Sequence, residues 1–132
     1  MSADPLEDLV VDEMALAKEH LAKGLAPYVG LTERGEVVFT EAARQLTAAK
    51  RLLAVLLAMR AGRVLGLRRE AGATPVELSA CTGIPAGTVR PKLAELRRAH
   101  LVSKEGGRYV VPIASIRLAI TALPMLRPAH QS

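Results

Sequence analysis

The pattern of apolar and polar positions near the middle of the chain predicts a short helix with defined ends. Thr74, Pro75 and Glu77 form a helix start, with a capping hydroxyl, a proline at the first helical position and a carboxylate that bonds back to the cap. We expect the helix itself to cover residues 76–81. Gly83 ends it, because glycine tolerates the left-handed backbone of a tight helix end.

The next apolar positions predict a second helix followed by a hairpin. Ile84 is expected to be buried in the turn, and Thr88 is expected to start the helix. This helix then buries one stripe with i, i+4 and i+7 spacing, formed by Val89, Leu93 and Leu96. Two strand-like runs follow at 101–104 and 108–111, and the pair of glycines between them is a hairpin turn signal.

This order of helix, tight turn, basic helix and small hairpin resembles the winged helix-turn-helix superfamily. The resemblance covers residues 74–111, and more of the chain if the helical block from Thr47 onward supplies the first helix of the motif. It implies a mainly α-helical fold with a small β-hairpin wing. Most winged helices bind DNA, but some are protein–protein modules, so the fold alone does not decide the function. The residues that carry the resemblance are Leu78, Gly83, Ile84, Thr88, Val89, Leu93, Leu96, Leu101 and Val102.

Pro91 departs from the superfamily pattern, because proline has no backbone N–H to donate. The first turn of a helix needs no such donor, since its N–H groups have no helical partner. With Thr88 as the cap, Pro91 would be the third residue of the helix and would do no harm there. We therefore expect a recognition helix that starts late or bends at this point.

The pattern before and after this region predicts further elements. One helix is expected from Pro5 to Leu25, and a small hairpin from 29 to 39. Thr40 to Arg63 is either one helix or a helix broken near 46–47. A last helix is expected from Pro112 to Leu123. The chain is thus interpreted as an N-terminal packing or dimerisation extension, a winged helix-turn-helix domain, and a C-terminal helix with a tail, at 1–46, 47–112 and 113–132.

The centre of the main helical block, residues 52–59, is apolar on all sides. A helix of this kind is usually covered from more than one direction. Either the N-terminal helix or a second copy of the chain could supply the missing cover. We therefore expect a homodimer, with the N-terminal helix, residues 52–59 and the last helix as candidate interface elements.

Charge is unevenly placed and changes the functional interpretation. Residues 1–23 carry six carboxylates and two lysines, a net of −4, whereas residues 44–132 carry fifteen Lys or Arg and four Glu, a net of +11. A basic body is typical of polyanion-binding proteins, although solvated basic helices give the same pattern. With two Tyr, one Phe and no Trp, recognition of single strands by stacking is disfavoured. Double-stranded DNA is the expected partner.

Chemistry of other kinds is not expected. His20, His100 and His130 are far apart and lack acidic or cysteine neighbours at ligand spacing, so we expect no catalytic centre, metal or cofactor. Cys81 is the single cysteine, which fits a reducing cytoplasm. The longest apolar run, 52–59, is far shorter than the roughly 20 residues of a membrane span. No small-molecule effector domain is apparent.

The resemblance leaves two functions open. One is a sequence-specific, dimeric transcriptional regulator, and the other is a protein–protein adaptor within a larger assembly. The cations of the second helix favour DNA, since only Glu95 opposes them there. Arg90 is the expected base reader, because its planar fork matches two acceptors of guanine. Thr88 has two candidate roles, capping the helix and contacting phosphate, and capping is the expected one. The full set of candidate DNA-binding residues is Thr88, Arg90, Lys92, Arg97, Arg98, Lys104 and Arg108.

Overall fold

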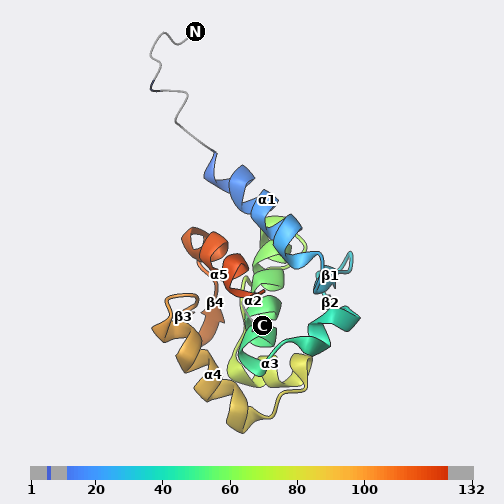
Figure 1. Cartoon of the computed structure of the whole chain (residues 1–132), viewed down its shortest axis with the longest axis vertical. Helices are drawn as coiled ribbons and strands as arrows, with labels where there is room; N and C mark the ends of the chain where they lie inside the picture. Colours follow the sequence, from blue (N-terminus) through green and yellow to red (C-terminus); the bar gives the residue numbers. More distant parts are fainter. Residues whose placement is uncertain (1–5, 7–11, 125–132) are drawn as a thin grey trace, which may run out of the picture.

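The computed structural model of the chain describes Leu6 and residues 12–124. Within these residues the fold is mainly helical, with two small antiparallel hairpins, as expected from the sequence (Figure 1). The elements in chain order are α1 (Glu13–Leu25), β1 (Val29–Leu31), β2 (Val37–Phe39), the 3-10 helix η2 (Glu41–Gln45), α2 (Ala48–Val64), α3 (Pro75–Thr82), α4 (Ala86–Arg98), β3 (Ser103–Glu105), β4 (Arg108–Val110), the 3-10 helix η3 (Ile113–Ser115) and α5 (Ile116–Ala122).

Helix α2 is the centre of the molecule, and the other elements are arranged around it (Figure 1). Residues 52–59 are between 0% and 5% exposed, because α1, α3, α4, α5 and both hairpins pack against α2 in the same chain. The expectation that 52–59 lies at a dimer interface is therefore wrong. Of the two interpretations of 40–63, the broken helix is confirmed: η2 ends before Leu46, whose extended backbone precedes the cap Thr47.

Helix α1 covers one end of α2 and also packs on α5. Its buried residues are Ala17, Leu21 and Leu25. The prediction of a single helix from Pro5 is wrong, because Asp12 has an extended backbone and its carboxylate accepts hydrogen bonds from the N–H groups of Met14 and Ala15. Asp12 is thus an N-cap, which fixes the helix start at Glu13. Residues 1–5 and 7–11 lie outside the described residues.

The β1–β2 hairpin was expected and is confirmed, with Val29 paired to Phe39 and Leu31 paired to Val37. Its turn is held by Thr32, whose hydroxyl accepts hydrogen bonds from the N–H groups of Arg34 and Glu36. Three-residue strands are marginal alone. This hairpin is stabilised by contact with α2.

Helix α3 has the start and stop signals that the sequence predicts. Thr74 and Glu77 form a reciprocal capping box, Pro75 is the first helical residue, and Gly83 closes the helix with a left-handed backbone. Ile84 is buried in the turn, with 4% of its surface exposed. The helix runs from Pro75 to Thr82, one residue longer at each end than the expected 76–81.

Helix α4 starts earlier than the sequence analysis placed it. Pro85 occupies the N-cap position, and the N–H groups of Thr88 and Val89 both bond to its carbonyl. Thr88 is therefore the third helical residue and not a cap, and Pro91 is the sixth and not the third. The missing N–H of Pro91 falls in the second turn, where a helical bond is lost. Pro91 is exposed, so this part of the helix borders solvent.

The β3–β4 hairpin follows α4 and turns at Gly106 and Gly107, both of which have positive φ. A third segment joins it, because Ala73 pairs with Tyr109 through two backbone hydrogen bonds, of 2.8 and 3.1 Å. This pairing fixes the start of α3 against the hairpin. Gly72 lies so close to the carbonyl group of Tyr109 that a Cβ there would overlap it.

The last helix is shorter than predicted. Residues 113–115 form η3, and α5 begins only at Ile116. Its buried residues Ile116, Ala119 and the following Leu123 pack into the core formed with α1 and α2. Gly24 of α1 permits close packing here, since a Cβ at that position would overlap the side chain of Ile120.

We predict that Gly72→Ala lowers the free energy of unfolding by about 1–3 kcal/mol, because the added methyl group overpacks the contact with Tyr109. Gly87→Ala is the matched control: a Cβ there has no atom within 4 Å, and loss of a helical glycine stabilises by roughly 0.5–1 kcal/mol. Urea unfolding followed by circular dichroism measures both. Equal stability of the two variants would contradict the packing argument.

Candidate nucleic-acid interface

The outward side of α4 is defined by the stripe that the helix buries. Val89, Leu93 and Leu96 face the core with 0%, 0% and 6% of their surface exposed. At 3.6 residues per turn, the opposite side of the helix is occupied by Gly87, Pro91, Ala94 and Arg98. We call these four residues the outer face of α4. Three of them are small or compact, so the backbone of α4 is accessible to a large ligand.

Three predicted DNA-binding arginines lie on or beside the outer face. Arg98 belongs to it, while Arg90 and Arg97, seven residues apart, share one flank. All three are exposed, and no hydrogen bond or ion pair within the described residues holds their side chains. Three free guanidinium groups along about two turns make the outer face and this flank positively charged.

The other flank of α4 is closer to neutral. Lys92 donates to Glu95 at 3.1 Å, so its charge is already paired. Thr88 is half-buried, and its backbone bonds to Pro85 within the first turn. The predicted DNA-binding residues of α4 thus fall into two groups. The three arginines have unpaired side chains, whereas Lys92 and Thr88 already interact within the chain.

Lys104 and Arg108 of the β3–β4 hairpin differ in the same way. Lys104 is exposed, and its ammonium lies 5.8 Å from the ring centroid of Tyr109, within the range of a cation–π contact. Arg108 has about a third of its side chain exposed, at 34%, and is engaged inside the molecule.

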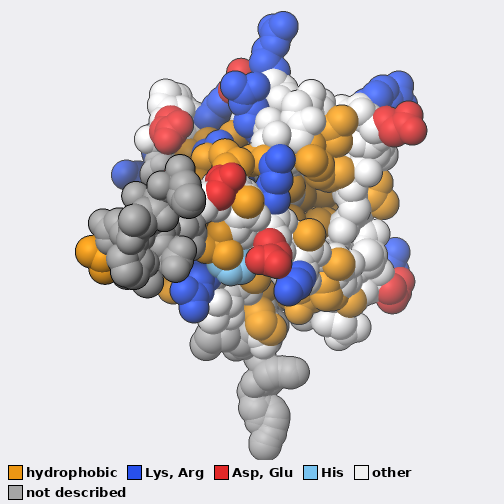
Figure 2. Space-filling view, turned by 90° about the horizontal axis from the view of Figure 1, so that it is seen from above, with side chains coloured by type: hydrophobic (Ala, Val, Ile, Leu, Met, Phe, Trp, Pro, Cys, Tyr) orange, Lys and Arg blue, Asp and Glu red, His pale blue; other side chains and the backbone are white. Residues whose placement is uncertain are grey.

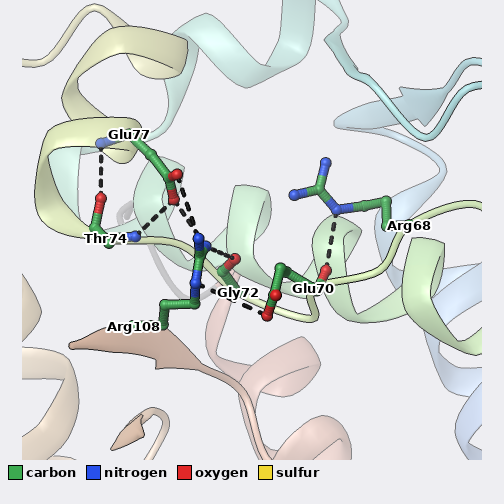
Figure 3. A network of polar contacts seen from close by, with 6 residues as sticks. All are labelled: Arg68, Glu70, Gly72, Thr74, Glu77 and Arg108. Atoms are coloured by element: carbon green, nitrogen blue, oxygen red, sulfur yellow. Dashed lines mark hydrogen bonds and ion pairs between the residues drawn. The ribbon is translucent and has the colours of Figure 1, made fainter. Parts of the chain in front are cut away.

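Arg108 is the centre of a polar network that joins the hairpin to the start of α3 (Figure 3). Its Nη1 donates to Glu77 Oε1 at 2.9 Å and to the carbonyl of Gly72 at 3.2 Å. Its Nε lies 3.8 Å from a carboxylate oxygen of Glu70. Glu77 Oε1 also accepts the N–H of Thr74 at 3.0 Å, so the capping box and the ion pair share one oxygen. The arrangement favours positioning of the hairpin as the main role of Arg108.

The capping box of Glu77 was predicted from the sequence, but its ion pair with Arg108 was not, and neither were the contacts of Glu70 and Gly72 in this network. The pKa of the Glu77 carboxyl lies below its ordinary value, mainly because the Thr74 N–H donates to it and further because of the Arg108 charge; partial desolvation opposes these effects. Glu77 therefore remains ionised and compensates the charge of Arg108 at neutral pH.

Cys81, the single cysteine of the chain, lies next to the turn between α3 and α4. Although the residue has exposed surface, burial around the thiol raises its pKa. Its sulfur lies 3.7 Å from the carbonyl oxygen of Leu78, to which the S–H donates. A raised pKa lowers the thiolate fraction, so this thiol is less reactive than an ordinary one.

Residues 12–124 and Leu6 contain no group of three or more His, Cys, Asp or Glu side chains that could hold a metal ion. Within the same residues, the helices are all too short or too polar to cross a membrane.

A scan against protein-family models, a search of curated proteins and a search of solved structures each found no match to this chain. The function is therefore inferred from the geometry and charge of the residues described above.

We predict that Glu77→Gln lowers stability at neutral pH and less so in acid. Because the folded pKa of Glu77 is lowered, its contribution is complete above the ordinary value of 4.5 and is lost as the pH falls through the folded pKa. The difference in unfolding free energy between wild type and Glu77→Gln should thus shrink below about pH 4.5.

Glu33→Gln is the control, since Glu33 is exposed and forms no ion pair within the described residues. Urea titrations across the acid range measure the difference for each variant. A Glu77→Gln difference that stays constant with pH would argue against the ion-pair network.

Proposed function

We propose that this chain is a winged helix-turn-helix protein that binds double-stranded DNA sequence-specifically and acts as a small transcriptional regulator. The observation that carries the proposal is the outer face of α4, with its compact residues and the three unpaired arginines Arg90, Arg97 and Arg98. The order α2, α3, α4, β3, β4 supports it. The pairing of Ala73 with Tyr109, which adds a third segment to the hairpin, supports it too.

In the proposed mechanism, α4 enters the major groove and its basic side chains supply affinity by neutralising phosphates and releasing counterions. Arg90 lies near the start of the helix and reads base edges through its bidentate fork. Arg97 and Arg98 lie two turns further on and contact the backbone. Lys104 contacts the backbone from the hairpin, and Arg108 positions that hairpin through Glu77.

The alternative is a protein–protein adaptor that uses the same fold. An adaptor surface of this kind would favour apolar side chains on the outer face of α4. The exposed large apolar residues of the chain lie elsewhere within the described residues, at Leu6, Met14, Leu16, Val38, Leu65, Val76 and Leu118. The DNA-binding function is therefore preferred.

Homodimerisation through the end of the molecule that carries α1 is part of the proposal. An apolar groove of about 350 Å³ lies there, lined by α1, β1 and the second half of α2 up to Leu65. Figure 2 looks onto this end, where hydrophobic side chains gather between scattered charged ones. Met14 and Leu16 of α1 are 38% and 41% exposed. Antiparallel packing of two α1 helices would also bring Glu13 of one copy towards Lys23 of the other, since these residues mark opposite ends of the helix.

We predict that Arg90→Ala weakens binding to the preferred DNA site by about 1–3 kcal/mol and relaxes its base preference. Arg97→Ala or Arg98→Ala should instead weaken binding to all sequences and reduce the salt slope by about one unit each. Fluorescence anisotropy with genomic fragments at several salt concentrations measures both quantities.

Arg63→Ala is the matched control, because Arg63 is an exposed arginine in the last turn of α2, outside the proposed surface. If Arg90→Ala binds DNA as tightly as Arg63→Ala, α4 is not the DNA-binding surface and the adaptor function takes precedence.

We further predict that the wild-type chain is a dimer at micromolar concentration and that Leu16→Glu makes it a monomer, because the new charge would be buried unpaired at the interface. Val76→Glu adds the same charge at an exposed position of α3, at the opposite end of the molecule, and should remain dimeric (Figure 1). Light scattering distinguishes these outcomes. A stable wild-type monomer would refute the dimer.

A further inference from the structure

A second candidate site lies away from the outer face of α4, in a polar pocket of about 390 Å³. It is bordered by the end of β2, by η2, by the first turn of α2 and by the end of α3. We call it the Arg51 pocket. Its polar side chains are Thr40, Glu41, Arg44, Arg51 and Thr82.

Arg51 is the residue that distinguishes this pocket from an ordinary surface depression. Its Nη2 donates to the carbonyl of Leu46 over a long distance of 3.4 Å. Its Nε is the one buried side-chain nitrogen or oxygen among the described residues without a hydrogen-bond partner. Buried N–H groups, and charged ones above all, almost always have an acceptor. The guanidinium of Arg51, a residue that lines the pocket, thus has a donor that no protein group satisfies.

The remaining polar groups show which chemistry the pocket favours. Thr40 donates to the carbonyl of Pro27 at 2.6 Å, and Thr82 donates to the carbonyl of Leu78 at 2.6 Å, so both hydroxyl hydrogens are already used. Two guanidinium groups, Arg44 and Arg51, remain as donors.

The carboxylate of Glu41 also borders the pocket and offsets part of its positive charge. Glu41 lies 3.8 Å from Arg44, but the two side chains are 82% and 77% exposed, so their attraction is weak and screened. Arg44 is therefore free to turn towards a stronger anion. With Glu41 counted, the titratable groups of the pocket sum to one positive charge, and no acidic residue lies in the first turn of α2 to oppose them. The positive end of that helix adds to the same potential.

We propose that the Arg51 pocket binds a phosphate oxyanion through the guanidinium groups of Arg44 and Arg51. Two planar forks match the tetrahedral oxygens of phosphate by charge-assisted hydrogen bonds. Where the occupant is a DNA backbone phosphate, the inference rests on the proposed function. Thr82 is followed directly by the turn that leads into α4, so the pocket lies at the end of α3 that precedes that helix in the chain. Lys104 lies beyond the C-terminal end of α4, so backbone contacts would precede and follow α4 in the chain.

The first experimental arm tests the pocket without DNA, using the full chain and inorganic phosphate. Potassium phosphate should raise the melting temperature by a few degrees more than potassium chloride at equal ionic strength, because a ligand that binds the folded state stabilises it. Arg44→Ala and Arg51→Met should remove this extra shift. Arg63→Ala, at the other end of α2, should keep it.

The second arm uses duplex DNA. Arg44→Ala should reduce the salt slope of binding by about one unit relative to Arg63→Ala, since one phosphate contact is lost. Arg44 is exposed, so this variant should fold even if Arg51→Met does not. Arg51→Lys keeps the charge without the fork and should recover only part of the phosphate-dependent shift.

Each outcome decides a separate point. No extra stabilisation by phosphate, together with equal salt slopes for Arg44→Ala and Arg63→Ala, overturns the site. A phosphate-dependent shift with unchanged slopes supports a site for free phosphate and overturns its assignment to the DNA backbone. A phosphate-dependent shift in a wild-type chain that binds no DNA keeps the site and rejects the proposed function.

Discussion

The burial of α2 on all sides is the constraint on which the rest of the structure depends. In an isolated helix, residues 52–59 would expose eight consecutive apolar positions to water. Full burial of each large side chain among them stabilises the fold by about 1.5–3 kcal/mol. No single partner can cover a helix from every direction. The chain therefore wraps α1, α3, α4, α5 and both hairpins around it, and this wrapping puts α1 and α5 at one end and α3 and α4 at the other (Figure 1).

Much of this arrangement could be predicted from local sequence because its signals are local. The capping box of Thr74 and Glu77, the left-handed Gly83 and the paired glycines of the β3–β4 turn each depend on a few adjacent residues, and the structure has all of them. The start of α4 was misplaced for a local reason as well. Pro85 forms no side-chain cap, whereas Thr88 has a hydroxyl that suits a cap, so the stronger signal lay at the wrong residue.

Other features could not be predicted because they join distant segments. Arg108 is a basic residue next to a turn, which indicates a phosphate contact until its neighbours are known. Glu70 and Glu77 reach it only because Ala73 pairs with Tyr109 and brings the start of α3 onto the hairpin. The Arg51 pocket likewise needs the end of β2, η2, the start of α2 and the end of α3 together. The residues of such a site do not recur at a regular spacing, so no periodic pattern in the sequence predicts it.

In α4, the residues that stabilise the helix by packing and the residues that leave its backbone accessible lie on opposite sides. Gly87 and Pro91 are both unfavourable in helices, one for its backbone freedom and the other for its missing N–H. The helix persists because Val89, Leu93 and Leu96 are buried against α2 and α3, and tertiary packing of this kind outweighs propensity. The unfavourable residues lie on the opposite side, where a bulky side chain would hold a ligand away from the backbone. Under the proposed function, this low profile lets Arg90 reach into a groove from the flank, while the packing that holds α4 in place lies on the face that DNA does not touch.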